Sequence, residues 1–184
     1  MKRTLRVIGL AALVALPAMA SAQEGRPVSF GVSGGLSLPV GDLGDGFDAG
    51  YNITGHIAYK PASFANLSFR GDVSFDRFGA KDVDDVNYRA LGVSANAVYA
   101  FPQTTPGVVR PYVLGGVGFW NSKVSASSGG ITGSTSSSDL GIQAGAGINF
   151  QLSGFSTFLE AKFVNVFGDG DSVSWIPITF GFKF

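Results

Sequence analysis

The chain has 184 residues, which is enough for one domain and argues against several independent enzyme modules. Charged residues make up only 14% of it, against roughly 25% in soluble domains, while Gly contributes 27 residues. The 13 basic and 13 acidic residues give no electrostatic footprint for nucleic acid. The absence of Cys and the single His, His56, exclude disulfides, thiolate sites and multi-His metal sites. We therefore expect no metal and no cofactor.

The first 22 residues have the pattern of a secretory signal peptide helix. A basic start, Met1–Arg6, precedes an apolar run, Val7–Leu16, that is too short to span a bilayer as a helix. Small residues follow and predict cleavage between Ala22 and Gln23. Without residues 1–22 the chain keeps 10 basic and 13 acidic residues, a net charge of −3. We therefore predict an exported domain over residues 23–184.

Apolar residues alternate with small or polar residues along most of this domain. From Leu140 to Leu152 every even position is apolar and every odd position is Gly, Asn or Gln. This period of two indicates a strand with two different faces. The same alternation predicts eight strands, at about 28–38, 51–60, 67–76, 91–101, 109–120, 140–152, 159–163 and 176–184. On the fifth both faces are apolar or Gly, so its facing stays open.

The connections between these strands fall into a short and a longer set. Those at 61–66, 102–108 and 153–156 are short, whereas those at 39–50, 76–87, 121–139 and 168–174 are mostly longer and rich in Asp, Gly and Ser. Alternating turns and loops are typical of a strand meander that crosses a membrane. We predict an all-β, eight-stranded antiparallel up-and-down transmembrane β-barrel, with short turns and both termini periplasmic and long loops extracellular. The longest loop, 121–139, contains a Ser/Gly/Thr-rich stretch, 125–138, that is expected to be flexible.

The facing of the strands follows from composition. Alternation alone also fits a soluble lipocalin-like barrel, but the polar face here holds mainly Gly, Ser, Thr, Asn and Gln, which suits a narrow lumen better than a water-exposed exterior. Charges inside must be paired. The predicted polar lumen network is His56, Lys60, Arg70, Asp72, Glu160 and Lys162. Aromatic residues near the strand ends, including Trp120 and Trp175, are expected in the interfacial girdles.

Residues 27–184 resemble the small eight-stranded outer-membrane β-barrels of the OmpX and OmpA-transmembrane-domain type. The strand Trp175–Phe184, with Phe180, Phe182 and Phe184 on one face, is similar to the C-terminal assembly signal of that family. The segment Leu38–Asp42 before a Gly-rich loop is similar as well. The resemblance implies the outer membrane of a Gram-negative-type bacterium. Implied partners are outer-membrane lipid and, during biogenesis, the barrel-assembly machinery and periplasmic chaperones.

No motif indicates catalysis. Gly31–Gly35 matches G-x-S-x-G, but the motif requires a strand-turn-helix context and Ser33 lies inside a predicted strand. The loop acids lack calcium-loop spacing. We expect a non-enzymatic barrel with a structural or surface-contact role, in adhesion or envelope integrity, that binds an extracellular ligand through its loops. A lipid-modifying enzyme using His56, a soluble periplasmic carrier and a narrow pore are the alternatives.

Overall fold

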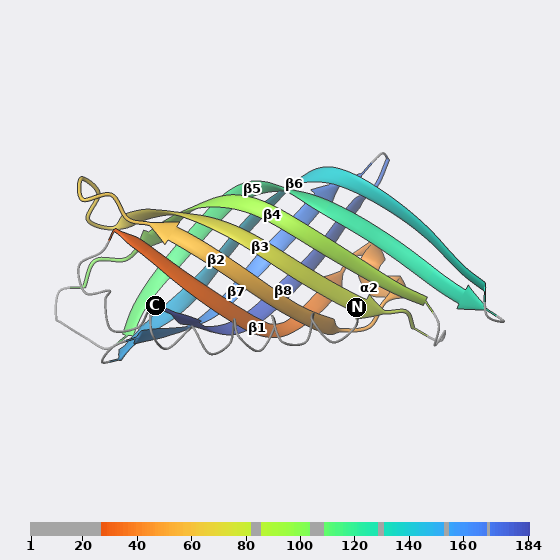
Figure 1. Ribbon diagram of the computed structural model, residues 1–184, viewed down its shortest axis with the longest axis horizontal. Helices are drawn as coiled ribbons and strands as arrows, with labels where there is room; N and C mark the ends of the chain where they lie inside the picture. The colour runs from red at the N-terminus through yellow and green to blue at the C-terminus, as the bar shows by residue number, and fades with distance from the viewer. Residues whose placement is uncertain (1–26, 82–85, 104–108, 129–130, 153–154, 169) are drawn as a thin grey trace, which may run out of the picture.

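The computed structural model describes residues 27–81, 86–103, 109–128, 131–152, 155–168 and 170–184. Eight strands form one closed barrel in which each strand pairs antiparallel with the next and β8 pairs with β1, as predicted (Figure 1). The predicted signal peptide and the bond between Ala22 and Gln23 lie outside the described residues. The strands are β1 Val28–Val40, β2 Gly50–Tyr59, β3 Leu67–Gly79, β4 Val86–Ala100, β5 Val109–Ser128, β6 Ile131–Leu152, β7 Phe155–Phe167 and β8 Ser172–Lys183.

The barrel closes between its first and last strands. Val32 of β1 is opposite Phe182 of β8, and beyond the strand end the backbone amide of Phe184 donates a 2.8 Å hydrogen bond to the carbonyl of Phe30. Such closure leaves no sheet edge in the bilayer, where unpaired backbone groups cost several kcal/mol each. Phe180 and Phe182 are exposed on the outer surface of the last strand. Recognition of these residues and Phe184 by assembly machinery stays a prediction.

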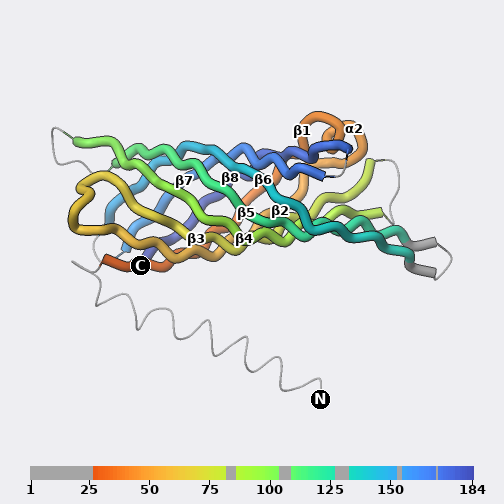
Figure 2. The backbone as a smooth tube through the Cα atoms, turned by 90° about the horizontal axis from the view of Figure 1, so that it is seen from above, coloured from red at the N-terminus to blue at the C-terminus, as the bar shows by residue number. Residues whose placement is uncertain are grey.

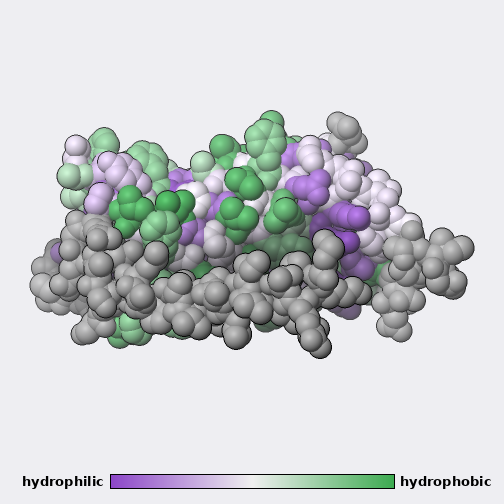
Figure 3. Space-filling model, viewed as in Figure 1, coloured by the Kyte–Doolittle hydropathy of each residue, from purple (hydrophilic) through white to green (hydrophobic). Residues whose placement is uncertain are grey.

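The barrel is apolar outside and polar inside, and the two sets of side chains alternate along each strand. Figure 3 shows apolar side chains over the middle of the barrel surface. The fifth strand, whose facing the sequence left open, follows the same rule. Val117 and Phe119 are 60% and 63% exposed, whereas Tyr112 and Trp120 are 3% and 1% exposed. Even-numbered residues of β5 from Tyr112 to Trp120 therefore point into the lumen.

The two ends of the barrel differ. One end, here called the termini end, carries Val28 and Phe184; the other, the hairpin end, carries the far ends of β5 and β6 and the short helix α2, Asp42–Gly46 (Figure 2). At the hairpin end β5 and β6 project beyond the other strands (Figures 1 and 2). In the described ranges no helix is long and apolar enough to cross a membrane.

The prediction of a long flexible loop at 121–139 is wrong. β5 continues to Ser128 and β6 begins at Ile131, and their register is continuous from Val109 opposite Phe150 to Ser128 opposite Ile131. The polar stretch keeps a strand conformation because each residue finds a backbone partner across the hairpin. Side-chain composition carries no information about this pairing. Residues 121–128 of β5 and 131–140 of β6 are called the β5–β6 extension below.

The other loops are shorter than the sequence indicated. β3 and β4 continue into the expected loop at 76–87, to Gly79 and from Val86, and β8 begins at Ser172, inside the expected loop at 168–174. The expected loop at 39–50 contains α2 and a bridge between Phe47 and Ala80. Leu43 of this helix is buried over the barrel mouth. Helix α2 therefore packs on the hairpin end instead of forming an open loop.

Candidate functional site

A buried charge network fills the lumen on the termini side. Arg70 on β3 donates hydrogen bonds of 2.7 and 2.9 Å to the two carboxylate oxygens of Glu160 on β7. The same guanidinium contacts Asp72, with Nε 2.8 Å from Oδ1 and Nη2 3.0 Å from Oδ2. Lys162 Nζ lies 3.4 Å from Asp72 Oδ2 and 3.9 Å from Glu160 Oε1. The Tyr112 hydroxyl donates a 2.7 Å hydrogen bond to Glu160 Oε2.

This network joins strands that are far apart in the chain. Arg70 and Glu160 are separated by 90 residues and meet only because the barrel is closed. Two cations, Arg70 and Lys162, face two carboxylates, Asp72 and Glu160, so the formal charges of the four groups cancel. Buried charges at this depth are tolerated when they are paired and hydrogen-bonded.

Two residues expected in this network, Lys60 and His56, do not take part in its hydrogen bonds and ion pairs. Lys60 follows the end of β2 and is exposed at the termini end, so the expectation of a lumen position for it is wrong. The alternation ended at Tyr59, and the face of the next residue could not be taken from it. His56 does point into the lumen, but its ring packs edge-on against Phe158, with centroids 5.4 Å apart. The carboxylates near it are already held by Arg70.

A second polar group lies nearer the hairpin end. Asp76 on β3 accepts hydrogen bonds from the Ser37 hydroxyl and, at 2.8 Å, from the Asn52 amide. The Thr54 hydroxyl donates a 2.9 Å hydrogen bond to the side-chain carbonyl of Asn52. None of these side chains is more than 4% exposed. Asp76 is an acidic lumen residue that the sequence analysis missed, although its even position on β3 matches that of Arg70 and Asp72.

An aromatic plug closes the lumen at the hairpin end. Trp120 on β5 and Trp175 on β8 meet edge to face with ring centroids 6.5 Å apart, and Phe78 lies 6.3 Å from Trp175. These three side chains are at most 1% exposed. The expectation that Trp120 and Trp175 lie in an interfacial girdle is therefore wrong. Alternation along the last strand puts Trp175 on the face of Pro177 and Thr179, away from Ile176, and so indicates an inward position. The facing of Trp120 could not be taken from the fifth strand, where both faces are apolar or Gly.

Inward-facing glycines make room for these large side chains. A Cβ at Gly92 would collide with the indole of Trp120, and one at Gly31 would collide with the imidazole of His56. These inward-facing glycines therefore reflect close packing inside a narrow barrel. Small and large side chains alternate across neighbouring strands, as the filling of an eight-stranded barrel requires.

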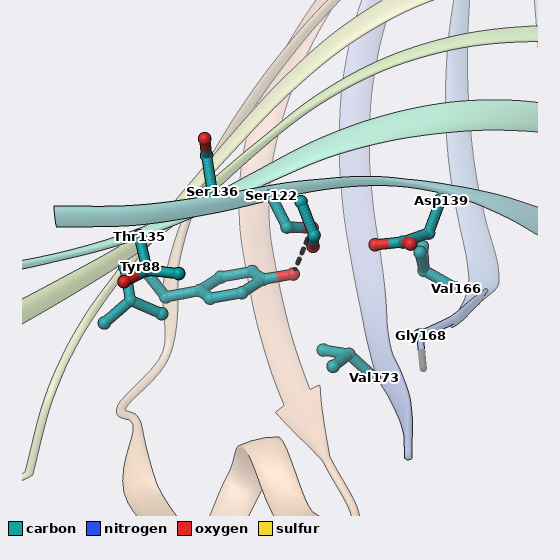
Figure 4. A pocket seen from close by; sticks show the side chains of 10 residues that line it. Tyr88, Ser122, Thr135, Ser136, Asp139, Val166, Gly168 and Val173 are labelled. Carbon is teal, nitrogen blue, oxygen red and sulfur yellow. Dashed lines mark hydrogen bonds between the residues drawn. The ribbon is translucent and has the colours of Figure 1, made fainter. Parts of the chain in front are cut away.

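A small pocket opens above the plug, at the mouth of the barrel (Figure 4). Its volume is about 160 Å³. Tyr88 donates to or accepts from Ser122 at 2.7 Å, and Asp139 points toward the same space (Figure 4). Three valines, Val124, Val166 and Val173, contribute apolar surface to the lining, and residues 135–137 of β6 and Gly168 complete it. Asp139 is the single charged residue of the lining.

The outer edge of the β5–β6 extension lies beside this pocket. β6 pairs with β7 only from Gly141 onward, whereas it pairs with β5 along its whole length. Within the described part of the chain, the edge of residues 131–140 on the β7 side has no strand partner. Unpaired strand edges present free backbone donors and acceptors.

The remaining candidate motifs have structural placements. Ser33 of the G-x-S-x-G match is buried inside β1 and not at a turn before a helix. Asp42 and Asp45 lie in the first turn of α2. In the described ranges no three His, Asp or Glu side chains form a group that would hold a metal.

A closed antiparallel barrel with an apolar exterior and a filled polar interior is a transmembrane β-barrel, because only closure satisfies every backbone group within a bilayer. The family described as outer membrane protein beta-barrel domain matches residues 8–184. The chain belongs to this family and is an integral protein of the outer membrane. The soluble carrier alternative is therefore wrong. Among curated proteins no sequence matches the chain.

Solved structures show the same fold at low sequence identity. Neisserial surface protein A (NspA) aligns with a TM-score of 0.62 at 14% identity, covering 88% of this chain and 98% of its own. A major outer membrane protein from Thermus thermophilus aligns with a TM-score of 0.57 at 14% identity, covering 86% and 99%. Ail, the attachment invasion locus protein of Yersinia pestis, aligns with a TM-score of 0.54 at 18% identity, covering 85% and 97%. These likenesses concern the fold.

Proposed function

We propose that this protein is a non-enzymatic surface-contact barrel whose β5–β6 extension binds an extended segment of an extracellular partner. The observation that carries the proposal is the unpaired edge of residues 131–140. An extended peptide adds to such an edge through main-chain hydrogen bonds, and alternate side chains give specificity. Two barrels of similar fold, NspA and Ail, are named for the surface and for attachment.

The composition of the edge supports this role. Natural edge strands are protected by Lys, Pro or bulges. The segment Ile131–Leu140 contains no Lys and no Pro, and its single charge is Asp139. Ser and Thr dominate, so the edge stays soluble without being blocked. A sheet edge of this kind, held away from the membrane, is open to strand addition.

The pocket at the mouth indicates the chemistry of the partner. At about 160 Å³ it is smaller than the roughly 300–1,000 Å³ of sites that enclose small molecules. It is suited to one side chain. The valines would pack against an alkyl stem, and Asp139 would pair with a cation at its tip. We therefore propose a partner strand that directs a Lys or Arg side chain toward Asp139.

The proposed orientation places the termini end in the periplasm and the hairpin end outside the cell. Loops and projections on a rigid scaffold are where recognition is usually carried. The chain has no Cys, so a single introduced thiol reports its location cleanly. In intact cells, a membrane-impermeant maleimide should label Ser134→Cys but label Lys60→Cys only after the outer membrane is opened. The reverse labelling would contradict the orientation.

The binding test uses the mature barrel in detergent micelles and a labelled synthetic peptide that alternates Thr with Lys. Fluorescence anisotropy should show binding to the complete barrel. A variant in which a short Gly-Ser turn replaces residues 122–137 should lose it while still inserting, and Asp139→Asn should weaken it. A peptide that alternates Thr with Glu is the matched control. Equal binding by the shortened barrel, or no binding by the complete one, would overturn the proposal.

The absence of catalysis and of conduction is part of the proposal. His56 lies inside the lumen beside carboxylates that Arg70 already holds, so no base and nucleophile converge. Trp120, Trp175 and Phe78 fill the path along the axis. Lipid A that has the same structure in cells overproducing the protein and in cells overproducing its His56→Ala variant would support the absence of catalysis. Planar-bilayer recordings that show no channel currents would support the absence of conduction.

A further inference from the structure

Three cations lie side by side on the outer wall of the barrel. Arg77 on β3 is directly opposite Arg89 on β4, and Arg89 is directly opposite Lys123 on β5. Arg77 and Arg89 point outward, because their neighbours Phe78 and Tyr88 are buried inside. Lys123 points outward as well, because its neighbours Ser122 and Val124 line the pocket at the barrel mouth. These three residues are called the cation row below. Opposite residues of an antiparallel pair have Cβ atoms about 4.5–5.5 Å apart, so the row spans roughly 10 Å.

The three side chains of the cation row repel one another. Like charges directly opposite each other destabilise a sheet. Among the described residues no acidic side chain lies within ion-pair distance of the row, since every such ion pair is in the lumen. An anion from outside the chain would turn this repulsion into attraction.

The position of the row indicates where that anion comes from. Val73, Val93 and Phe119, on the same outward face toward the middle of the barrel, are more than half exposed and meet lipid tails. Beside the row, Tyr51 on β2 is directly opposite Arg77 and is exposed. Exposed Tyr side chains of this kind mark the level of the lipid headgroups. Figure 3 shows strongly hydrophilic side chains next to the apolar band on the hairpin side.

We propose that the cation row binds the phosphate of an outer-leaflet lipid whose acyl chains lie against the apolar wall below. Guanidinium groups pair with phosphate through two parallel hydrogen bonds. A phosphate monoester carries about −1.5 to −2 charges at neutral pH, whereas a phosphodiester carries one. Three adjacent cations therefore fit a phosphomonoester lipid better than a phosphodiester lipid. The inference uses the proposed orientation only to assign the leaflet.

The test presents the mature barrel with nanodiscs of phosphatidylcholine that contain lipid A, which bears phosphate monoesters. Native mass spectrometry of the released protein counts the lipids that remain bound. The wild-type protein should retain lipid A in preference to phosphatidylcholine. Arg77→Gln, Arg89→Gln and Lys123→Gln together should reduce this retention by roughly tenfold or more, given about fivefold for each basic residue near an anionic surface. Lys60→Gln, which removes an exposed cation at the other end, should change nothing.

Two further arms use the wild-type protein and do not depend on folding of the variant. Enzymatically dephosphorylated lipid A should lose its preference, and phosphatidylglycerol should be retained less than lipid A. Equal retention of the dephosphorylated lipid, or equal retention by the triple variant, would overturn the proposed site. Equal retention of phosphatidylglycerol would overturn its preference for monoesters. Both nanodisc leaflets carry the lipid, so failure here is separate from failure of the orientation or of peptide binding.

Discussion

The two halves of the lumen are closed by opposite chemistries. On the termini side, Arg70 and Lys162 balance Asp72 and Glu160 in a hydrogen-bonded network. On the hairpin side, Trp120, Trp175 and Phe78 fill the cross-section with apolar volume. The first closure depends on every partner being present, because a lone buried charge is costly. The second depends on shape, because a rigid plug fits only where its neighbours leave room.

The largest effect is expected from removing the central cation. Arg70→Met leaves Glu160 and Asp72 with only Lys162 as a counterion, and breaking a buried ion pair from one side costs about 3–5 kcal/mol. We expect the free energy of unfolding, measured by urea titration of the refolded barrel in lipid vesicles, to fall by this amount. Adding Glu160→Gln to Arg70→Met should recover part of the loss.

The control for this change is Lys60→Met, at an exposed site where surface substitutions stay within about 0.5 kcal/mol. A loss below about 1 kcal/mol for Arg70→Met would show that water enters the network and compensates the carboxylates. The lumen on the termini side would then be hydrated and not closed by its charge network.

A smaller effect is expected from enlarging a residue beside the plug. Gly92→Val would force its side chain against the indole of Trp120, and overpacking of this kind costs about 1–3 kcal/mol. Gly115→Val is the matched control, because Gly115 faces outward and has space. The compact band of unheated protein on a detergent gel should persist in both. Equal free energies of unfolding for the two variants would mean that the Trp120 side chain can shift at little cost.

The barrel architecture was largely predictable from the period of two in the sequence. The contacts within the charge network and within the aromatic plug were only partly predictable. Strand number, order and the inward position of Arg70, Asp72, Glu160 and Lys162 follow from alternation, since a strand face is fixed by odd or even numbering. Which charges meet depends on closure and register. Pairing across 90 residues leaves no local trace in the sequence.

The errors had two physical sources. Residue type predicted a girdle position for Trp120 and Trp175, although alternation along the last strand indicates that Trp175 faces inward. Composition predicts a loop for the β5–β6 extension, because Ser, Gly and Thr are typical of flexible segments. Strand conformation there rests on backbone pairing with β5, which composition does not encode. Pairing between strands therefore outweighed local preference in this segment.

The smallest effect is expected in the β5–β6 extension, where β5 still pairs with β4 but β6 has no β7 partner. The Asn121 amide donates a 2.8 Å hydrogen bond to Ser138 and a 3.2 Å one to the Ser137 carbonyl. Asn121→Ala should leave the global free energy of unfolding unchanged, because the extension opens locally, as regions at the low-stability end do. Loss of a hydrogen bond worth about 0.5–1.5 kcal/mol should instead speed amide hydrogen exchange of residues 131–138 by roughly threefold to tenfold.

Asn165 offers a matched control for this prediction. It donates a 2.6 Å hydrogen bond to Ser174 directly across β7 and β8, as Asn121 does to Ser138 across β5 and β6. Both strands of the Asn165 pair belong to the closed barrel, and each has a second neighbour. Asn165→Ala should therefore leave local exchange slow. Equal changes in amide hydrogen exchange for the two variants would contradict the prediction. The free edge of β6 would then not lower the local stability of the extension below that of the barrel wall.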